Sequence, residues 1–229
     1  THELIDVARS ACKAAGRFII ENRNQPLDVA SKGFANQASD VVTQIDLAAQ
    51  AIILDILQPT LTRYDLGLLA EEGDQDTSRL TKHAFWTIDP LDGTQYFIEG
   101  QAGFTTSIAL VSRDGRPILG VAYDPIHDHL YEAVVGGGVL LNGEPLPELQ
   151  SQDDTRETIW FADRSLRRHP SFKDFEEQFN IRMMGGAVFN TLQLLTTPNS
   201  CYCKAPKKEV GGCAIWDLAA VSLMLEESG

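Results

Sequence analysis

The sequence predicts a mixed α/β fold in which helices and sheets form layers. Two long helices, each with one apolar face, are expected near the amino terminus. Three apolar runs separated by hairpin turn residues follow, and the rest of the chain alternates strands with helices. Such alternation is typical of helices packed on a sheet, because the apolar face of a sheet must be covered. With 229 residues and 43% hydrophobic content, the chain can bury the core of one or two compact units.

The two amino-terminal helices are predicted from apolar residues that recur every three or four positions. The first extends from about Glu3 to Glu21. The second extends from Val42 to Leu57, before Pro59, and carries Asp46 in or near its first turn. Both helices are therefore expected to be amphipathic.

Short apolar runs after these helices predict strands. Leu66 to Ala70 and Ala84 to Ile88 are each followed at once by acidic residues, which is typical of buried strands that end in a site. The stretch from Phe104 to Val135 predicts an antiparallel meander. The remaining elements are expected to be strands near Thr158 to Ala162 and Ser200 to Lys204, and helices near Ser171 to Phe179, Ala187 to Leu195 and Ile215 to Glu226. A polar linker, roughly Pro145 to Thr155, predicts a boundary between an N-terminal half (residues 1–145) and a C-terminal half (146–229).

Composition excludes several classes of protein. The formal charge of −13, from 32 acidic and 19 basic residues, argues against a basic face that grips nucleic-acid polymers. The four cysteines, Cys12, Cys201, Cys203 and Cys213, lack zinc-site spacing and are interpreted as reduced thiols. No apolar run approaches the roughly 18 residues of a membrane span, and no signal pattern opens the chain. We therefore expect a soluble, cytoplasmic protein without a membrane partner.

Carboxylates gather at the ends of four predicted elements. They belong to Asp46, to the pair Glu71-Glu72, to the run from Asp89 to Thr94, and to Asp217. In the third segment, Pro90 keeps Asp89 extended before the chain turns, so Asp89 and Asp92 can point into one cavity. Gly93 allows close approach of the backbone to a ligand, and Thr94 begins a turn or helix with free N–H donors.

Several carboxylates in one place repel each other unless cations join them. Mg²⁺ prefers oxygen ligands and retained waters, which suits these side chains and a backbone carbonyl such as that of Leu91. Paired cations can bind an attacking water and the oxygens of a phosphate ester. The sequence thus favours a phosphomonoesterase that uses roughly two or three Mg²⁺ ions and acts on a small phosphate ester.

These motifs resemble those of the inositol monophosphatase family, the lithium-sensitive, Mg²⁺-dependent phosphatases. The resemblance covers the chain and implies an α-β-α-β-α sandwich, as in fructose-1,6-bisphosphatase, and often a homodimer. It implies metal ligation by Glu71, Asp89, the Leu91 carbonyl, Asp92 and Asp217, and a catalytic set of Asp46, Thr94 and Glu71, in which Asp46 and Thr94 activate the nucleophilic water. It also implies phosphate binding by the N–H groups of Gly93 and Thr94, and a substrate pocket that includes Asp92, Gly185, Gly186, Ala187, Glu209 and Asp217.

The chain departs from the family pattern in a few places. Gly186 stands where Ser or Thr is usual, Ala70 precedes the acidic pair where Gly is common, and Gln95-Tyr96 replaces the usual pair before Phe97. The family also continues beyond the equivalent of Gly229, so a further segment is expected there.

The identity of the phosphate ester stays open between two substrates. The runs from Asp89 to Ile98, Phe104 to Leu110 and Pro117 to Val121 resemble those of bacterial bisphosphate nucleotidases, which slightly favours a 3′(2′),5′-bisphosphate nucleotide. The lysines Lys204, Lys207 and Lys208 could meet its second phosphate. The run from Asp40 to Thr43, with Glu209, favours inositol 1-phosphate. A third interpretation is a non-catalytic metal or anion sensor on the same fold, although Asp46 and Thr94 are both present.

Overall fold

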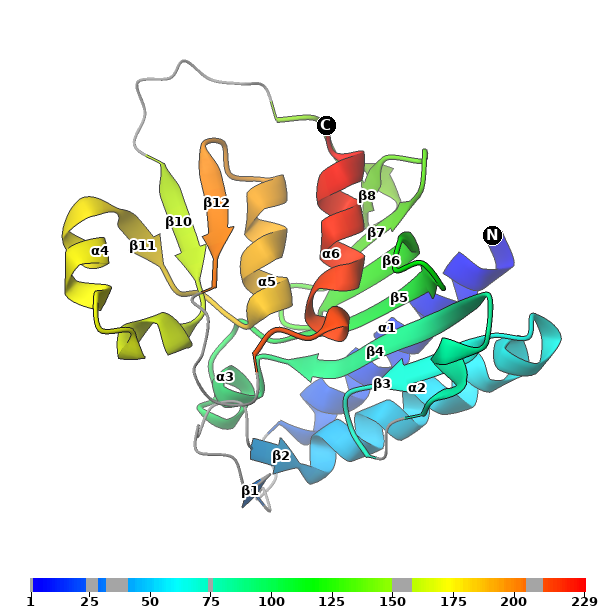
Figure 1. The fold of residues 1–229 in the computed structure, drawn as a ribbon. Coiled ribbons are helices and arrows are strands. Elements are labelled where there is room, and N and C mark those ends of the chain that lie inside the picture. Colours follow the sequence, from blue (N-terminus) through cyan, green and yellow to red (C-terminus); the bar gives the residue numbers. More distant parts are fainter. Residues whose placement is uncertain (1, 24–28, 32–40, 74–75, 150–157, 205–211) are drawn as a thin grey trace.

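The computed structural model describes residues 2–23, 29–31, 41–73, 76–149, 158–204 and 212–229. Figure 1 shows the layers in order: helices α1 and α2, a seven-stranded sheet, helices α5 and α6, a three-stranded sheet, and α4. The predicted α-β-α-β-α sandwich is confirmed. The helices are α1 (His2–Asn22), α2 (Gln44–Arg63), α3 (Thr94–Ile98), α4 (Phe172–Gln178), α5 (Ala187–Leu192) and α6 (Ile215–Glu227), with 3₁₀ turns at Ser78–Leu80, Arg164–Arg168 and Gln193–Leu195.

The large sheet has the order β3-β4-β5-β6-β7-β8-β9, in which β3 and β4 are parallel and all other pairs are antiparallel. Its core is the predicted meander, and β8 and β9 extend it by a hairpin that the sequence did not predict. Its strands are β3 (Gly67–Ala70), β4 (Ala84–Asp92), β5 (Thr105–Ser112), β6 (Pro117–Asp124), β7 (His129–Val134), β8 (Val139–Leu141) and β9 (Glu144–Pro145).

The small sheet is entirely parallel, with the order β11-β10-β12. Its strands β10 (Ile159–Ala162) and β12 (Ser200–Cys203) were predicted, whereas β11 (Asn180–Arg182) was not. Because the strands are parallel, all three strands of the small sheet end at the same edge.

A separate antiparallel ribbon joins β1 (Val29–Ser31) to β2 (Val41–Thr43) just before α2.

Helix α2 differs from the predicted second helix at both ends. It begins at Gln44, because the preceding residues form β2, and it continues through Pro59 to Arg63. Proline removes a hydrogen bond inside a helix. However, Thr60, the buried residue directly after Pro59, accepts a hydrogen bond from Trp86 Nε1 at 2.9 Å. Tertiary packing therefore outweighs the local preference for a helix end.

The apolar content of α2 is that of a core helix. By length and composition it also passes for a membrane span, contrary to our expectation that no segment would. Its apolar residues Ile45, Ala49, Ile53 and Leu57 are buried with α1 and one face of the large sheet. The packing of these residues accounts for the composition.

The large sheet is covered on both faces. Trp86 of β4 packs in the cluster under α1 and α2, whereas its neighbour Phe85 packs with α5 and α6 on the other face. Every residue of β4 is buried, which fits a strand between two helical layers. Helix α6 lies so close to β6 that a Cβ at Gly120 would come within 2.7 Å of the Ala220 backbone. The stretches before and after the expected boundary near Pro145 thus share one core.

A latch of side chains joins α3 to the C-terminal stretch. The Arg164 guanidinium lies 3.8 Å from the centre of the Tyr96 ring and donates hydrogen bonds to Glu99 at 2.5 Å and Gln101 at 2.6 Å. The Tyr96 hydroxyl donates to the Met183 carbonyl at 3.1 Å. These contacts fix α3 and the residues that follow it relative to the segments around Arg164 and Met183.

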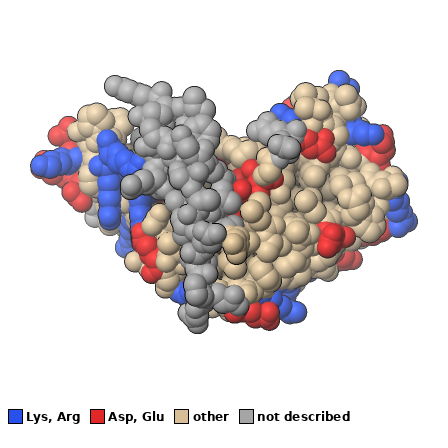
Figure 2. Space-filling model, turned by 90° about the horizontal axis from the view of Figure 1, so that it is seen from below, with Lys and Arg blue, Asp and Glu red and all other residues tan. Residues whose placement is uncertain are grey.

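The charged residues are distributed without one dominant basic surface on the face in Figure 2. On that face, acidic and basic side chains of the described residues are interspersed, with basic groups at the two ends of the view. This distribution is consistent with the acidic balance of the sequence.

Glycines allow the backbone contact between the two stretches of chain. Gly103 has φ +109, and a Cβ there would lie 2.1 Å from the Met184 carbonyl oxygen. Its own carbonyl accepts a hydrogen bond from Gly186 N at 2.9 Å. At this distance of approach only a residue without a side chain fits.

We predict that Gly103→Ala destabilises the protein by about 2 to 4 kcal/mol, because a positive φ and a backbone clash both penalise a Cβ. Gly115→Ala is the matched control, since Gly115 has φ +86 but open space around it. That control should cost only about 1 kcal/mol. Urea unfolding measures both, and equal losses would contradict the importance of the clash.

Candidate active site

The carboxyl end of β4 contains one extra residue. Asp89 pairs with Ser107 and Asp92 pairs with Thr105, so the register of β4 on β5 shifts between them. Pro90 lies in this stretch and has no N–H for a neighbouring strand. Side chains alternate along a regular strand, and a bulge of this kind turns Asp89 and Asp92 toward the same side.

Three carboxylates meet at this end of β4. One oxygen from each of Asp89, Asp92 and Asp217 lies within 4.8 Å of the others. Asp89 and Asp92 are buried, and Asp217 lies in the first turn of α6. Asp217 accepts hydrogen bonds from the Ala214 N–H at 2.7 Å and from the Cys213 thiol, which orient it. The structure thus brings together three of the residues that were predicted to bind metal.

The carboxylates of this cluster resist ionisation. Burial raises the pKa of Asp89 well above its usual value, and the charges of Glu71, Asp92 and Asp217 raise it further. Burial and Asp217 raise the pKa of Asp92 to about 7, while the Phe189 N–H opposes the rise. Burial also raises the pKa of Asp217 against the effect of Lys204. A site of this kind favours a bound cation, which would stabilise the ionised carboxylates.

The acidic loop after β3 joins the cluster through Glu71. Its charge raises the pKa of Asp89, and its backbone N–H donates to the Ile88 carbonyl at 3.1 Å. The neighbouring Glu72 is held by Gln50, whose side-chain amide exchanges two hydrogen bonds with the Glu72 backbone at 2.7 and 2.9 Å. Gln50 was not predicted as part of the site, and it fixes the loop that carries Glu71.

Asp46 and Thr94 lie next to each other, as the family resemblance implies. Asp46 is buried in the first turn of α2, and Thr94 is the first residue of α3. The Thr94 Oγ1 atom lies 3.3 Å from Asp46 Oδ1 and 3.0 Å from the Leu91 carbonyl oxygen. The hydroxyl therefore connects the proposed catalytic carboxylate with the carbonyl expected to bind metal.

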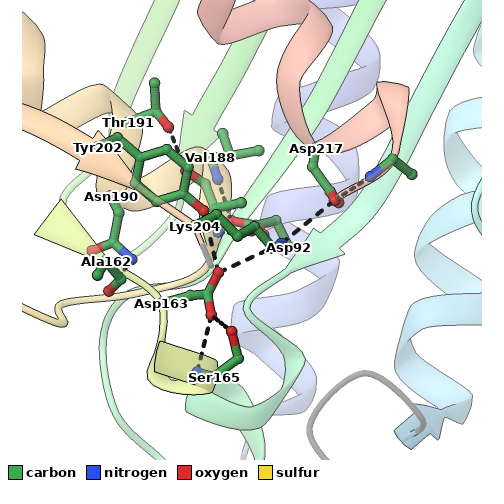
Figure 3. Close-up of polar contacts among 12 residues, drawn as sticks. Asp92, Ala162, Asp163, Ser165, Val188, Asn190, Thr191, Tyr202, Lys204 and Asp217 are labelled. Carbon is green, nitrogen blue, oxygen red and sulfur yellow. Dashed lines mark hydrogen bonds and ion pairs between the residues drawn. The ribbon is translucent and has the colours of Figure 1, made fainter. Parts of the chain in front are cut away.

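Asp92 also fixes the start of α5. Its carboxylate accepts backbone N–H groups of Ala187 and Val188 at 2.9 Å each and of Phe189 at 3.3 Å. Thr105 Oγ1 lies 3.3 Å from the same carboxylate. Figure 3 shows Asp92 close to the Lys204 side chain, with Val188 nearby. A carboxylate at a helix N-terminus is stabilised by unpaired N–H groups and by the helix dipole.

The predicted substrate residues Gly185, Gly186 and Ala187 form the turn into α5. A Cβ at Gly186 would lie 2.3 to 2.4 Å from the Asp92 carboxylate, so the glycine here has a steric reason. The turn is held by the buried Asn190, whose amide donates to the carbonyls of Gly185 at 2.6 Å and Ala162 at 3.2 Å. Asn190 was missed, and no local pattern in the sequence marks it.

A polar wall on the small sheet faces the carboxylate cluster (Figure 3). Lys204 Nζ lies 3.5 Å from Asp163 and 4.0 Å from Asp217. The Tyr202 hydroxyl donates to Asp163 at 3.3 Å, and the Ser165 N–H donates at 2.9 Å. The sequence analysis did not predict a role for Asp163, Ser165 or Tyr202. One feature of the sequence could have indicated this part of the site: Asp163 and Lys204 each directly follow a strand. Glu209, Lys207 and Lys208 lie outside the described residues.

Comparisons with known proteins agree with this geometry. Residues 1–229 match the profile of the Inositol monophosphatase family. Nus factor SuhB of Escherichia coli strain K12 is 28% identical over 100% of this chain and 84% of its own length. The extragenic suppressor protein suhB of Bartonella henselae has a TM-score of 0.81 and 28% identity, over 99% of this chain and 85% of that chain.

A third relative is inositol monophosphatase-II of Staphylococcus aureus. Its structure with bound 2′AMP has a TM-score of 0.76 and 27% identity, over 99% of this chain and 81% of that chain. Its complex with inositol monophosphate has a TM-score of 0.74 and 26% identity, over 99% and 80%. Because the family profile covers the chain from its first residue to its last, this protein belongs to the inositol monophosphatase family.

Proposed function

We propose that this protein is a Mg²⁺-dependent phosphomonoesterase. The observation that carries the proposal is the meeting of Asp89, Asp92 and Asp217, three buried or half-buried carboxylates whose pKa values are all raised. The oxygen donors fit a hard divalent cation, which the side chains of these residues, with Glu71 and the Leu91 carbonyl, would hold. When bound, Mg²⁺ lowers the pKa of a water molecule and polarises a phosphate oxygen.

The chain's own residues would position and deprotonate the water. Thr94 Oγ1 lies within reach of Asp46, so its hydroxyl can donate to that carboxylate while a lone pair accepts from the water. Asp46 is the proposed acceptor of the proton, and Glu71, whose charge acts on Asp89, is the second carboxylate proposed to take part in catalysis. The N–H groups of Gly93 and Thr94 precede the first backbone hydrogen bond of α3, made by Tyr96, and would bind phosphate oxygens.

The favoured substrate is a 3′(2′),5′-bisphosphate nucleotide, because a cationic side chain, Lys204, lies against the carboxylate cluster. The alternative is inositol 1-phosphate, favoured by the similarity to an S. aureus relative that binds both 2′AMP and inositol monophosphate. The E. coli relative is named a Nus factor, so a non-catalytic role is the third candidate for this protein. The presence of both Asp46 and Thr94 favours catalysis.

The proposal predicts phosphate release from 3′-phosphoadenosine 5′-phosphate and from inositol 1-phosphate at fixed Mg²⁺. We expect kcat/KM for the nucleotide to be at least about tenfold higher, equivalent to about 1.4 kcal/mol of transition-state discrimination. The opposite preference would identify an inositol phosphatase. No release from any small phosphate ester, with metal binding retained, would instead support the sensor.

Asp89→Asn should lower Mg²⁺-dependent kcat/KM by more than about a hundredfold, because a ligand of the proposed metal is lost. The Asn oxygen can still accept the Leu91 N–H that Asp89 accepts at 3.0 Å, so the backbone turn is preserved. Asp55→Asn removes the same charge from an exposed position of α2 and serves as the control. Near-normal activity of Asp89→Asn in steady-state assays would refute the metal assignment.

The same variant should show the opposite effect on stability. The raised folded-state pKa values mean that the metal-free wild type is most stable below the ordinary value of about 4 and loses stability as the pH rises above it. For Asp92 this loss continues to about pH 7, and the raised pKa of Asp89 adds a loss in the same direction. Asp89→Asn should lose less over this range. Mg²⁺ at 100 times its Kd should raise the wild-type Tm at pH 8 by about 5 to 10 °C, and that of the variant far less. Thermal unfolding with and without Mg²⁺ measures both effects.

Thr94→Ala should lower kcat far more than it raises KM, because the hydroxyl orients the water only for reaction. Thr94→Ser keeps the hydroxyl and is the matched control. A change confined to KM would make Thr94 a binding residue and remove it from the proposed proton path.

A further inference from the structure

The small parallel sheet directs all three of its strands toward the carboxylate cluster. Strand β11 leads into the turn with Gly185 and Gly186, β10 ends before Asp163, and β12 ends before Lys204. Ligands of α/β proteins bind beyond the carboxyl ends of parallel strands. The edge of this sheet thus forms a wall beside the carboxylate cluster.

Lys204 is the cation of this wall, and it is not a solvated surface lysine. Only 20% of its side chain is exposed. Its Nζ atom lies 3.5 Å from Asp163 and 4.0 Å from Asp217. Both distances exceed the roughly 2.7 to 2.9 Å of a charge-assisted hydrogen bond. An ammonium has three donors, and the contacts of Lys204 with the described residues are charge interactions at these longer distances, which leaves donors for a ligand.

Asp163 acts as the positioning residue for Lys204. The Ser165 hydroxyl and N–H contact one of its oxygens, and the Tyr202 hydroxyl and Lys204 contact the other. Both oxygens are therefore engaged by the protein. The fixed carboxylate keeps the ammonium at the edge of the cluster, and Asp163 itself has little remaining capacity to bind a substrate hydroxyl.

The charges in the metal-bound site would favour an anion beside Lys204. The ammonium and a metal ion would share the Asp217 carboxylate as a neighbour, and two cations so close repel each other. An anionic group between them removes this repulsion. In the proposed function, the phosphate undergoing hydrolysis would bind at the metal ions and the start of α3. An anion beside Lys204, on the wall formed by the small sheet, would then be a second group of the same substrate.

We propose that Lys204, positioned by Asp163, is the specificity residue that binds a second anionic group, a phosphate on the leaving group of the substrate. This inference rests on the proposed phosphomonoesterase activity and assigns a side chain to the choice between substrates. A neutral polyol leaving group would leave the ammonium without its anion.

The test compares 3′-phosphoadenosine 5′-phosphate with adenosine 3′-monophosphate, which lacks the second phosphate. In the wild type, kcat/KM for the bisphosphate should exceed that for the monophosphate by about tenfold or more. Lys204→Met should reduce this ratio to near one, chiefly through KM for the bisphosphate. Lys204→Arg should preserve the preference, and Lys173→Met, an exposed lysine of α4, should leave the ratio unchanged.

Two further variants keep the test independent of folding. Lys204→Gln retains a donor toward Asp163 and should lose the preference even if Lys204→Met is unstable. Asp163→Asn keeps the ammonium but loosens its position, so it should lower the ratio partly. Calorimetric Mn²⁺ binding to each variant, unchanged from the wild type, would show that the effect is not a loss of metal.

Failure of the inference is distinguishable from failure of the proposed function. Equal losses for both nucleotides in Lys204→Met would mean that Lys204 contacts the reacting phosphate or the metal site, and would overturn the inference with the activity intact. A wild type without preference for the bisphosphate would do the same. A wild type that hydrolyses no phosphate ester would refute the function itself.

Discussion

The contact between Asp92 and the N-terminus of α5 is the interaction on which the arrangement of the layers depends. This carboxylate accepts three backbone N–H groups of α5 and lies within 4.8 Å of two other carboxylates. The helix supplies positive potential that partly offsets the cost of burying the charge. In return, the carboxylate holds the N-terminus of α5 against the end of β4. Helix α5 in turn contacts the small sheet through the hydrogen bond from Asn190 to the Ala162 carbonyl. One side chain thus joins a proposed metal site to the packing of two sheets.

The burial of like charges sets a second constraint. A core of this size could be more stable with neutral residues in place of Asp89 and Asp92, because each buried carboxylate is kept from water and repelled by its neighbours. The protein compensates with rigid surroundings: Gln50 holds the acidic loop, and the glycines at 103 and 186 allow backbone contact without a side chain between. The site is therefore held by groups that do not themselves react.

The sequence predicted what depends on local patterns. The helices, the meander and the carboxylate segments each carry a periodic or punctuated signal, so they were found with small errors at their ends. Helix α2 continues through Pro59, and the sequence did not predict this. The hydrogen bond between Trp86 and Thr60 that supports this part of the helix is a long-range contact, which local sequence rules do not describe. Strand β11 is too short to show a period. Asp163 and Tyr202 gain their importance only when two strands distant in sequence become neighbours in the small sheet.

Helix α6 covers one face of the large sheet with its apolar side and brings Asp217 to the carboxylates at its first turn. The sheet, α5 and the other two aspartates precede it in the chain, so they leave the ribosome first, with the part of that face under α6 uncovered and the cluster incomplete. Docking of α6 closes the core and completes the constellation in a single step. A nascent or misassembled chain that still exposes the part of its sheet under α6 therefore also lacks one of the three aspartates of the proposed metal site.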